Sequence, residues 1–234
     1  MQNMDEELDE AAEEAPETAP SSRRWILIGC GVLAGLGLLG AGGLAVLLIA
    51  VRPQLNEAIE RSKIAACQAN LRQIYRAMLS YQIMYKQKLD ESGAKFLAQL
   101  YNRNAMEQTK ANALRLTCPS VELGSLTIGR MESWEEWWAN PDLVDGSYTA
   151  YAARNYRDFP IEKLPAPADE PLIACDNDPC MNHRDVTNVL YGDGRVVALS
   201  LTELKATGVV PPDAEMLVVG PGSPLEDLRK LSLD

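Results

Sequence analysis

The sequence is poor in the side chains that enzymes most often use. Its 234 residues include one histidine and two phenylalanines, and aromatic residues make up only 6% of the chain. There is no Gly-rich phosphate-binding loop and no candidate set of serine, histidine and aspartate. A lone histidine without an evident nucleophile is a poor catalyst. We therefore predict that the protein is not an enzyme.

Clusters of basic residues are also missing. The chain holds 33 acidic and 22 basic side chains, for a net charge of −11. Proteins that bind nucleic acid neutralise its phosphates with lysine and arginine, so we expect no nucleic-acid partner. The acids concentrate in residues 1–24, which contain Pro16 and Pro20 and no aromatic residue. This composition predicts an acidic disordered tail.

The sequence does contain one long uncharged run. Residues 25–51 carry no charge and are rich in Leu, Gly, Ala, Ile and Val. This exceeds the ~20 residues that cross a bilayer, whereas a cleavable signal peptide has a shorter apolar core behind a basic start. We predict a transmembrane helix with the lipid bilayer as partner. Gly31 and Gly35 permit close helix packing, although a Gly-rich anchor without a partner would show the same pattern.

The charges that flank this run bear on its orientation. Arg23 and Arg24 adjoin its N-terminal end, and Arg52, Arg61 and Lys63 follow the other end. The count is nearly balanced, but the adjacent arginine pair favours a cytoplasmic N-terminus. We expect the tail to be cytoplasmic and the domain to lie outside the cytoplasm.

The spacing of apolar residues after the span predicts a long amphipathic helix over 54–90. Spacings of three and four draw one apolar stripe, which consists of Ile64, Cys67, Leu71, Ile74, Met78, Tyr81 and Tyr85. A short second helix is expected around Phe96–Tyr101. Ser223-Pro224 is a helix-start pattern and predicts a short C-terminal helix over 224–231.

Residues 182–199 have the pattern of a β-hairpin. Two apolar, β-branched runs flank Asp193-Gly194, a dipeptide that suits a two-residue turn with positive φ. Since side chains alternate along a strand, Val189 and Tyr191 should share one face and Leu190 should lie on the other.

His183 stands nine residues before Asp193-Gly194, and this spacing resembles the signature of the prepilin-type H-X9-DG domain of pseudopilin-like proteins. Asn70-Leu71-Arg72-Gln73-Ile74 and Cys118-Pro119-Ser120 also resemble this group, especially its planctomycete-type members, which are related to type IV pilins and type II secretion pseudopilins. The resemblance implies an α+β fold, in which an N-terminal transmembrane helix continues into a long amphipathic helix packed on a small antiparallel sheet.

The same resemblance makes residues 52–234 a pilin-like domain. It implies a membrane-anchored structural or adaptor protein of the bacterial cell envelope, in the inner membrane with its domain on the periplasmic side. The expected partners are other pilin-like or secretion-system proteins, or a second copy bound through the transmembrane helix.

One feature of the prepilin pattern is absent. Prepilins carry a Gly-Phe-Thr-Leu-Ile-Glu-like cleavage motif at the membrane boundary, whereas this boundary has neither that glycine nor a glutamate inside the span. A glutamate in lipid is costly and usually functional. We therefore expect that residues 1–24 stay attached and that the protein does not enter a filament by the usual route.

Cys30 lies in the predicted span, and the other four cysteines lie beyond it. If the domain is exported, these four form two disulfides among three possible pairings. We expect Cys67–Cys118, which would tie the second helix to the long one, and Cys175–Cys180, which would close a loop before the hairpin.

A competing interpretation is a metal site formed by Cys175, Cys180 and His183 with Asp193 or Asp176. Thiolate and imidazole suit zinc, although Cys-x4-Cys-x2-His is not a common finger spacing. The alternative function is then an envelope metal-binding module. Asp176, Asn177 and Asp178 offer oxygen ligands for calcium but too few of them. We expect no cofactor, and we expect His183 to form a structural hydrogen bond near Asp193.

Overall fold

A computed structural model describes residues 22–175 and 183–234, with side chains described from Val51 onward. The chain divides into two compact units, Met1–Leu55 and Asn56–Asp234. Residues 1–21 of the predicted tail lie outside the described residues, as does the Asp176–Asp178 segment that was considered for calcium.

Helix α1 extends from Ser22 to Tyr85 and includes Pro53. The predicted span 25–51 falls within it, but the surroundings of its residues before Val51, Gly31 and Gly35 among them, lie outside the described part. Within the part of the chain that was described, no helix combines the length and the apolarity needed to cross a membrane. The transmembrane span therefore stays a prediction.

The second unit contains the amphipathic part of α1. Cys67, Leu71 and Met78 are fully buried, whereas Arg72 and Arg76 on the opposite side are exposed. The predicted stripe is therefore buried from Cys67 to Tyr81. The helix ends at Tyr85 rather than at residue 90, because Lys86 takes a φ of 52°, a left-handed conformation that ends helices.

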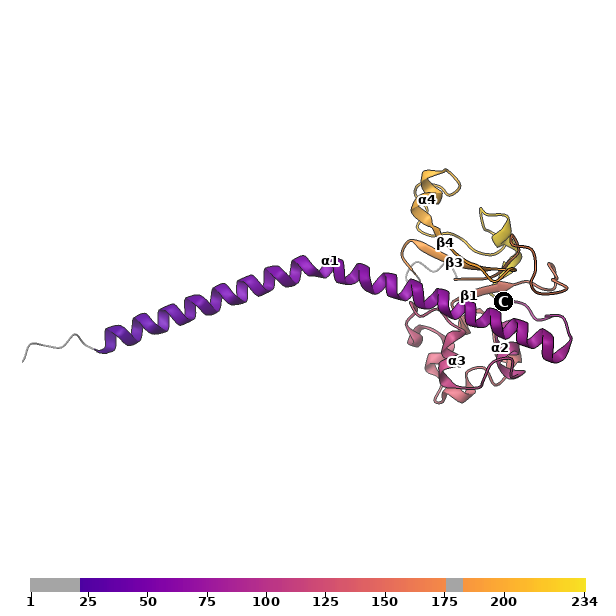
Figure 1. Ribbon diagram of the computed structural model, residues 1–234, viewed down its shortest axis with the longest axis horizontal. Helices are drawn as coiled ribbons and strands as arrows, with labels where there is room; N and C mark the ends of the chain where they lie inside the picture. The colour runs from indigo at the N-terminus through magenta and orange to yellow at the C-terminus, as the bar shows by residue number, and fades with distance from the viewer. Residues whose placement is uncertain (1–21, 176–182) are drawn as a thin grey trace, which may run out of the picture. The chain divides into compact units, whose positions relative to one another are not determined.

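Five strands form one antiparallel sheet in the order β4-β3-β2-β1-β5. Figure 1 labels three of them, β4, β3 and β1. The bounds of all five are Tyr151–Arg154 (β1), Pro171–Cys175 (β2), Val186–Tyr191 (β3), Val196–Ser200 (β4) and Leu231–Ser232 (β5). The domain is therefore α+β with a small antiparallel sheet, which is the fold class that the resemblance implied.

The two faces of this sheet belong to different cores. Leu190 packs in the cluster that contains the buried side chains of α1, and Val189 and Tyr191 pack in a second cluster. The predicted alternation along β3 is thus confirmed. Helices α2 (Gly93–Asn102) and α3 (Lys110–Arg115) contribute to the first cluster, and α4 (Leu201–Ala206) contributes to the second (Figure 1).

The hairpin between β3 and β4 has a longer loop than the sequence suggested. Tyr191 N–H donates to the Arg195 carbonyl, and Gly194 N–H donates to the Tyr191 carbonyl, so Gly192 and Asp193 occupy the centre of the turn. Gly194 follows at a φ of 88°. This is a three-residue loop with a glycine bulge. The expected two-residue turn is wrong, but the positive φ at Gly194 is confirmed.

Short 3₁₀ helices fill the region between α3 and β1. They comprise Leu123–Ser125, Thr127–Arg130, Trp134–Glu136, Pro141–Leu143 and Gly146–Tyr148. The expected C-terminal helix over 224–231 is replaced by one 3₁₀ turn, Asp227–Lys230, and by β5. Pairing of Leu231 with Arg154 of β1 draws the last residues into the sheet edge instead of a helix.

Candidate metal centre

Four side chains with metal-ligating atoms meet inside the domain. They are Cys67, Cys118, Cys175 and His183, hereafter the Cys/His cluster, and their ligand atoms all lie within 4.8 Å of one another. The three cysteines are at most 1% exposed, and His183 is 6% exposed. Each comes from a different segment of the chain, so the cluster joins parts that are distant in sequence.

Local structure explains why these residues meet. Cys67 lies on the buried stripe of α1, and Cys175 ends β2 in the same core cluster. Cys118 follows α3 in the Cys-Pro-Ser segment, and His183 shortly precedes β3. The packing of α1 on this face of the sheet therefore brings Cys67 of the helix next to Cys175 of β2.

The ligand atoms approach one another in two pairs. The sulfurs of Cys67 and Cys175 are 3.1 Å apart, and Cys118 Sγ lies 3.5 Å from His183 Nε2. The Tyr151 hydroxyl lies 3.6 Å from Cys67 Sγ. This hydroxyl is positioned to donate to the sulfur from the sheet side.

The other ring nitrogen of His183 faces oxygen atoms. Ser120 Oγ lies 2.7 Å from Nδ1, and Glu60 Oε1 lies 3.3 Å from it. A carboxylate oxygen only accepts hydrogen bonds, so this environment favours a proton on Nδ1. The Nε2 lone pair is then left to face the sulfurs, which is the tautomer that a metal-binding imidazole needs.

Contacts among the sulfurs shift the pKa values of Cys67 and Cys175 in opposite directions. Hydrogen bonds from Cys118 and Cys175 outweigh burial and lower the pKa of Cys67 to about 4. Its neighbours Cys118 and Cys67 raise the pKa of Cys175. Burial alone would lower the pKa of His183, but Cys118 and Glu60 raise it. The surroundings therefore favour the thiolate form at Cys67 and the neutral thiol at Cys175.

The cluster differs from the ligand set that the sequence suggested. Cys175 and His183 are together, but Asp193 lies in the hairpin loop, where Arg195 pairs with it at 3.4 Å. Cys180 lies outside the described residues. Spacing along the chain missed Cys67 and Cys118, although the helical stripe already placed Cys67 in the core.

The cysteine pairing also differs from the sequence-based expectation. Cys67, Cys118 and Cys175 are free thiols, so the expected Cys67–Cys118 disulfide is not formed in this structure. The physical reason is that Cys67 faces Cys175 while Cys118 faces His183. The expected Cys175–Cys180 pair involves a residue outside the described part of the chain.

His183 and Asp193 lie at opposite ends of β3 and do not interact with each other. The six-residue strand spans roughly 20 Å at the usual rise per residue. The expected hydrogen bond between His183 and the Asp193 region is therefore replaced by the contacts with Cys118 and Ser120.

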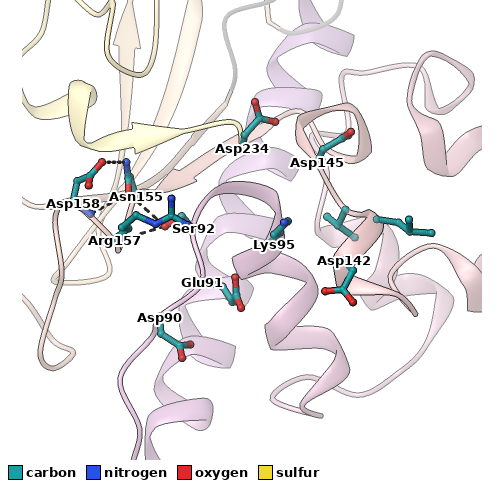
Figure 2. A pocket seen from close by; sticks show the side chains of 12 residues that line it. Asp90, Glu91, Ser92, Lys95, Asp142, Asp145, Asn155, Arg157, Asp158 and Asp234 are labelled. Carbon is teal, nitrogen blue, oxygen red and sulfur yellow. Dashed lines mark hydrogen bonds between the residues drawn. The ribbon is translucent and has the colours of Figure 1, made fainter.

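Apart from the Cys/His cluster, a surface pocket of about 460 Å³ is a second candidate site, because many acidic side chains line it (Figure 2). Asp90, Asp142, Asp158 and Asp234 are spread around its rim in Figure 2 rather than converging on one point. Asp234 already accepts from the Gly146 N–H and Asp158 from the Asn155 amide. This pocket therefore presents a solvated acidic surface.

Comparisons of the chain with protein-family models, with curated proteins and with solved structures find no match.

Proposed function

We propose that this protein is a membrane-anchored, pilin-like structural or adaptor protein of the bacterial cell envelope, with its domain on the periplasmic side of the inner membrane. The observation that carries the proposal is the role of α1, because the helix that contains the predicted membrane span also contributes a buried face to the core of the domain. Its face from Cys67 to Tyr81 is buried in the same cluster as one face of the sheet.

Three contacts align α1 with strand β3. Glu60 meets His183, the Gln68 amide donates to Asn188 Oδ1 at 3.1 Å, and the Tyr75 hydroxyl donates to the Gly192 carbonyl at 3.0 Å. The three contacts follow one another in the same order along α1 and along the segment that contains β3.

The two outer contacts therefore lie at the ends of the H-X9-DG segment, and the Gln68–Asn188 contact lies between them. Gly194 belongs to the second of these ends, since a Cβ there would meet the Tyr75 ring at 2.5 Å. The motif then has a packing role, as a structural domain requires, and needs no catalytic one.

Burial of the Cys/His cluster also supports a structural role. An enzyme needs its reactive groups at a cleft that substrate can enter. Here the three sulfurs are almost completely covered by the core. The alternative function, an envelope metal-binding module, draws support from the same cluster, but a closed site suits a permanently bound ion better than metal exchange.

Exposed apolar side chains on α1 offer a surface for a partner. Val51, Leu55 and Ile59 are spaced four residues apart and are 44%, 55% and 47% exposed. A spacing of four places residues on one side of a helix. Val51 ends the predicted span, and Leu55 and Ile59 follow it before the buried stripe begins. A partner helix of the same protein or of a pilin-like protein would pack along these residues.

Site-specific crosslinking tests this proposal in intact cells. A photo-reactive side chain at Ile59 should give one defined adduct, either with a second copy or with a pilin-like envelope protein. The matched control is Val209, an exposed apolar residue after α4 that is 41% exposed, and it should give no adduct. Absence of an adduct at Ile59, or equal adducts at both positions, would refute the adaptor role.

Protease access tests the topology separately. Protease added to intact spheroplasts should digest the domain from Asn56 onward, because the Arg23-Arg24 pair favours a cytoplasmic N-terminus. Full protection of the domain in spheroplasts, with digestion after lysis, would reverse the orientation.

A further inference from the structure

We propose that Cys67, Cys118, Cys175 and His183 bind one zinc ion in a closed structural site. This inference is independent of the pilin-like proposal, because it depends only on side chains inside the second unit. It also replaces both the ligand set that the sequence suggested and the Cys67–Cys118 disulfide.

The geometry of the cluster fits a single tetrahedral ion. With zinc–sulfur bonds of about 2.3 Å and a zinc–nitrogen bond of about 2.0 Å, neighbouring ligand atoms lie roughly 3.5–3.8 Å apart. The observed Cys118–His183 separation is 3.5 Å, and no two ligand atoms are more than 4.8 Å apart. Cys67 and Cys175, at 3.1 Å, need to separate by about 0.7 Å to accept an ion between them.

The donor atoms select zinc over the other common ions. Calcium and magnesium require oxygen ligands, and none of the four donors is oxygen. Thiolates and an imidazole suit zinc, and Cys₃His is one of its usual structural sets. A cluster of several irons needs ligands around a larger centre than four atoms within 4.8 Å can enclose.

The residues around the four donors complete the site. Ser120 and Glu60 hold the Nδ1 side of His183, so its Nε2 is directed at the sulfurs. Tyr151 approaches Cys67 with its hydroxyl. The buried Nδ2 of Asn188 has no hydrogen-bond partner among the described residues. Groups placed like Ser120, Glu60 and Tyr151 orient metal ligands and stabilise thiolates.

The position of the cluster assigns the ion a crosslinking role. Four protein ligands leave no open coordination position, so the ion would be structural rather than catalytic. It would link α1, the Cys-Pro-Ser segment, the end of β2 and the residue that leads towards β3. A structural ion contributes its binding free energy to folding, so it would fix α1 on the sheet.

Metal analysis of the full-length chain, purified in detergent without added metal, is the first test. We expect one zinc per chain, and X-ray absorption should show three sulfur neighbours near 2.3 Å and one nitrogen near 2.0–2.1 Å. Cobalt substitution should give the absorption bands of a tetrahedral thiolate site. A metal-free chain, or a coordination shell of oxygen and nitrogen, would overturn the proposal.

Variants then identify the ligands. Cys67→Ser and Cys118→Ser should lower the zinc content at least tenfold. Asp193→Asn and Cys180→Ser are the matched controls, because both residues belong to the ligand set suggested by spacing, and both should retain one zinc. Loss of zinc in Cys180→Ser with retention in Cys67→Ser would establish the other set and refute this one.

A variant that fails to fold would also lose zinc. A change that exchanges one ligand type for another avoids this ambiguity, because it should retain the ion. His183→Cys offers a fourth thiolate and should keep one zinc, now with four sulfur neighbours in the X-ray absorption spectrum. A spectrum that still shows three sulfurs and one nitrogen would exclude His183 as a ligand. Thiol titration of the denatured wild type, with chelator and without reductant, should find Cys67, Cys118 and Cys175 reduced. A disulfide between any two of them would overturn the site.

Discussion

The two faces of the sheet are held by different kinds of interaction. The face towards α1 packs bulky side chains such as Trp138, Tyr81 and Phe96, and it includes the Cys/His cluster. The opposite face packs small and aliphatic residues, among them Ala152, Ala174, Val189, Val210 and Leu217. Apolar burial is non-directional, whereas hydrogen bonds and metal ligation require defined angles.

The two faces therefore contribute differently to the stability of the domain and to the position of α1 along β3. The α1 face combines a large core with point contacts that fix how the helix lies along β3. The opposite face stabilises the domain mainly by covering the sheet, and strand β4 at its edge stays half-buried or exposed along its length. We therefore expect changes on the α1 face to cost more than matched changes on the other face.

Truncation of one leucine on each face should show the largest difference. Leu71→Ala removes a fully buried side chain of α1, and Leu217→Ala removes one that is 3% exposed in the second cluster. We expect about 3–5 kcal/mol for Leu71→Ala and about 2–3 kcal/mol for Leu217→Ala, because the larger core collapses less readily around the cavity. Denaturant unfolding of both variants measures this, and equal costs would mean that the two cores are equally rigid.

Two glycines provide a closely matched second comparison. Gly194 and Gly208 have φ values of 88° and 73°, but a Cβ at Gly194 would meet the Tyr75 ring, whereas a Cβ at Gly208 would meet nothing within 4 Å. Gly194→Val should therefore combine backbone strain with a clash and cost about 2–4 kcal/mol.

Gly208→Val should cost only the strain, about 1–2 kcal/mol. Thermal unfolding of both variants would report the gap. If Gly194→Val were no worse than Gly208→Val, the packing of the hairpin loop against Tyr75 would not contribute to stability.

Periodicity predicted the elements that local sequence determines. The stripe from Cys67 to Tyr81 and the alternation of Val189, Leu190 and Tyr191 follow from the geometry of helix and strand alone. The end of α1 and the hairpin loop were placed less accurately, because Lys86 and the Gly192–Asp193 turn depend on single backbone conformations that residue type does not dictate.

The cluster could be predicted only in part. Cys175 and His183 are close in sequence, so spacing could suggest that they act together. Cys67 and Cys118 join them through the packing of α1 and of the segment after α3 on the sheet, which are long-range contacts. Sequence offered disulfide pairing as an equally reasonable use for these two thiols.

The opposite face has a directional contact of its own, which acid should weaken. Arg154 lies on the same side of β1 as Ala152 and donates to Glu170 at 2.5 Å, and Lys230 donates to the same carboxyl at 3.0 Å. Burial would raise the pKa of Glu170, but the hydrogen bonds from Lys230 and Arg154 outweigh it and lower the pKa.

A carboxyl with a lowered pKa in the folded state stabilises the fold above its unfolded pKa, and this contribution disappears as pH falls through the folded value. Glu170→Gln should cost about 1–2 kcal/mol at pH 7, since the carboxyl is partly exposed. The difference from wild type should shrink below about pH 4. Unfolding measured between pH 3 and pH 7 checks this, and a pH-independent difference would exclude the ion pair as its cause.

The smallest expected effect concerns the orientation of His183. Ser120→Ala removes the oxygen 2.7 Å from Nδ1 but leaves Glu60 Oε1 at 3.3 Å, so a carboxylate oxygen stays close to the ring nitrogen. We expect a loss of about 0.5–1.5 kcal/mol, the usual contribution of one hydrogen bond, and a fall in melting temperature of roughly 1–6 °C. The double variant Ser120→Ala/Glu60→Gln removes the carboxylate as well and should cost more than the sum of the two single changes. Strict additivity would mean that the two oxygens do not substitute for each other in holding the ring.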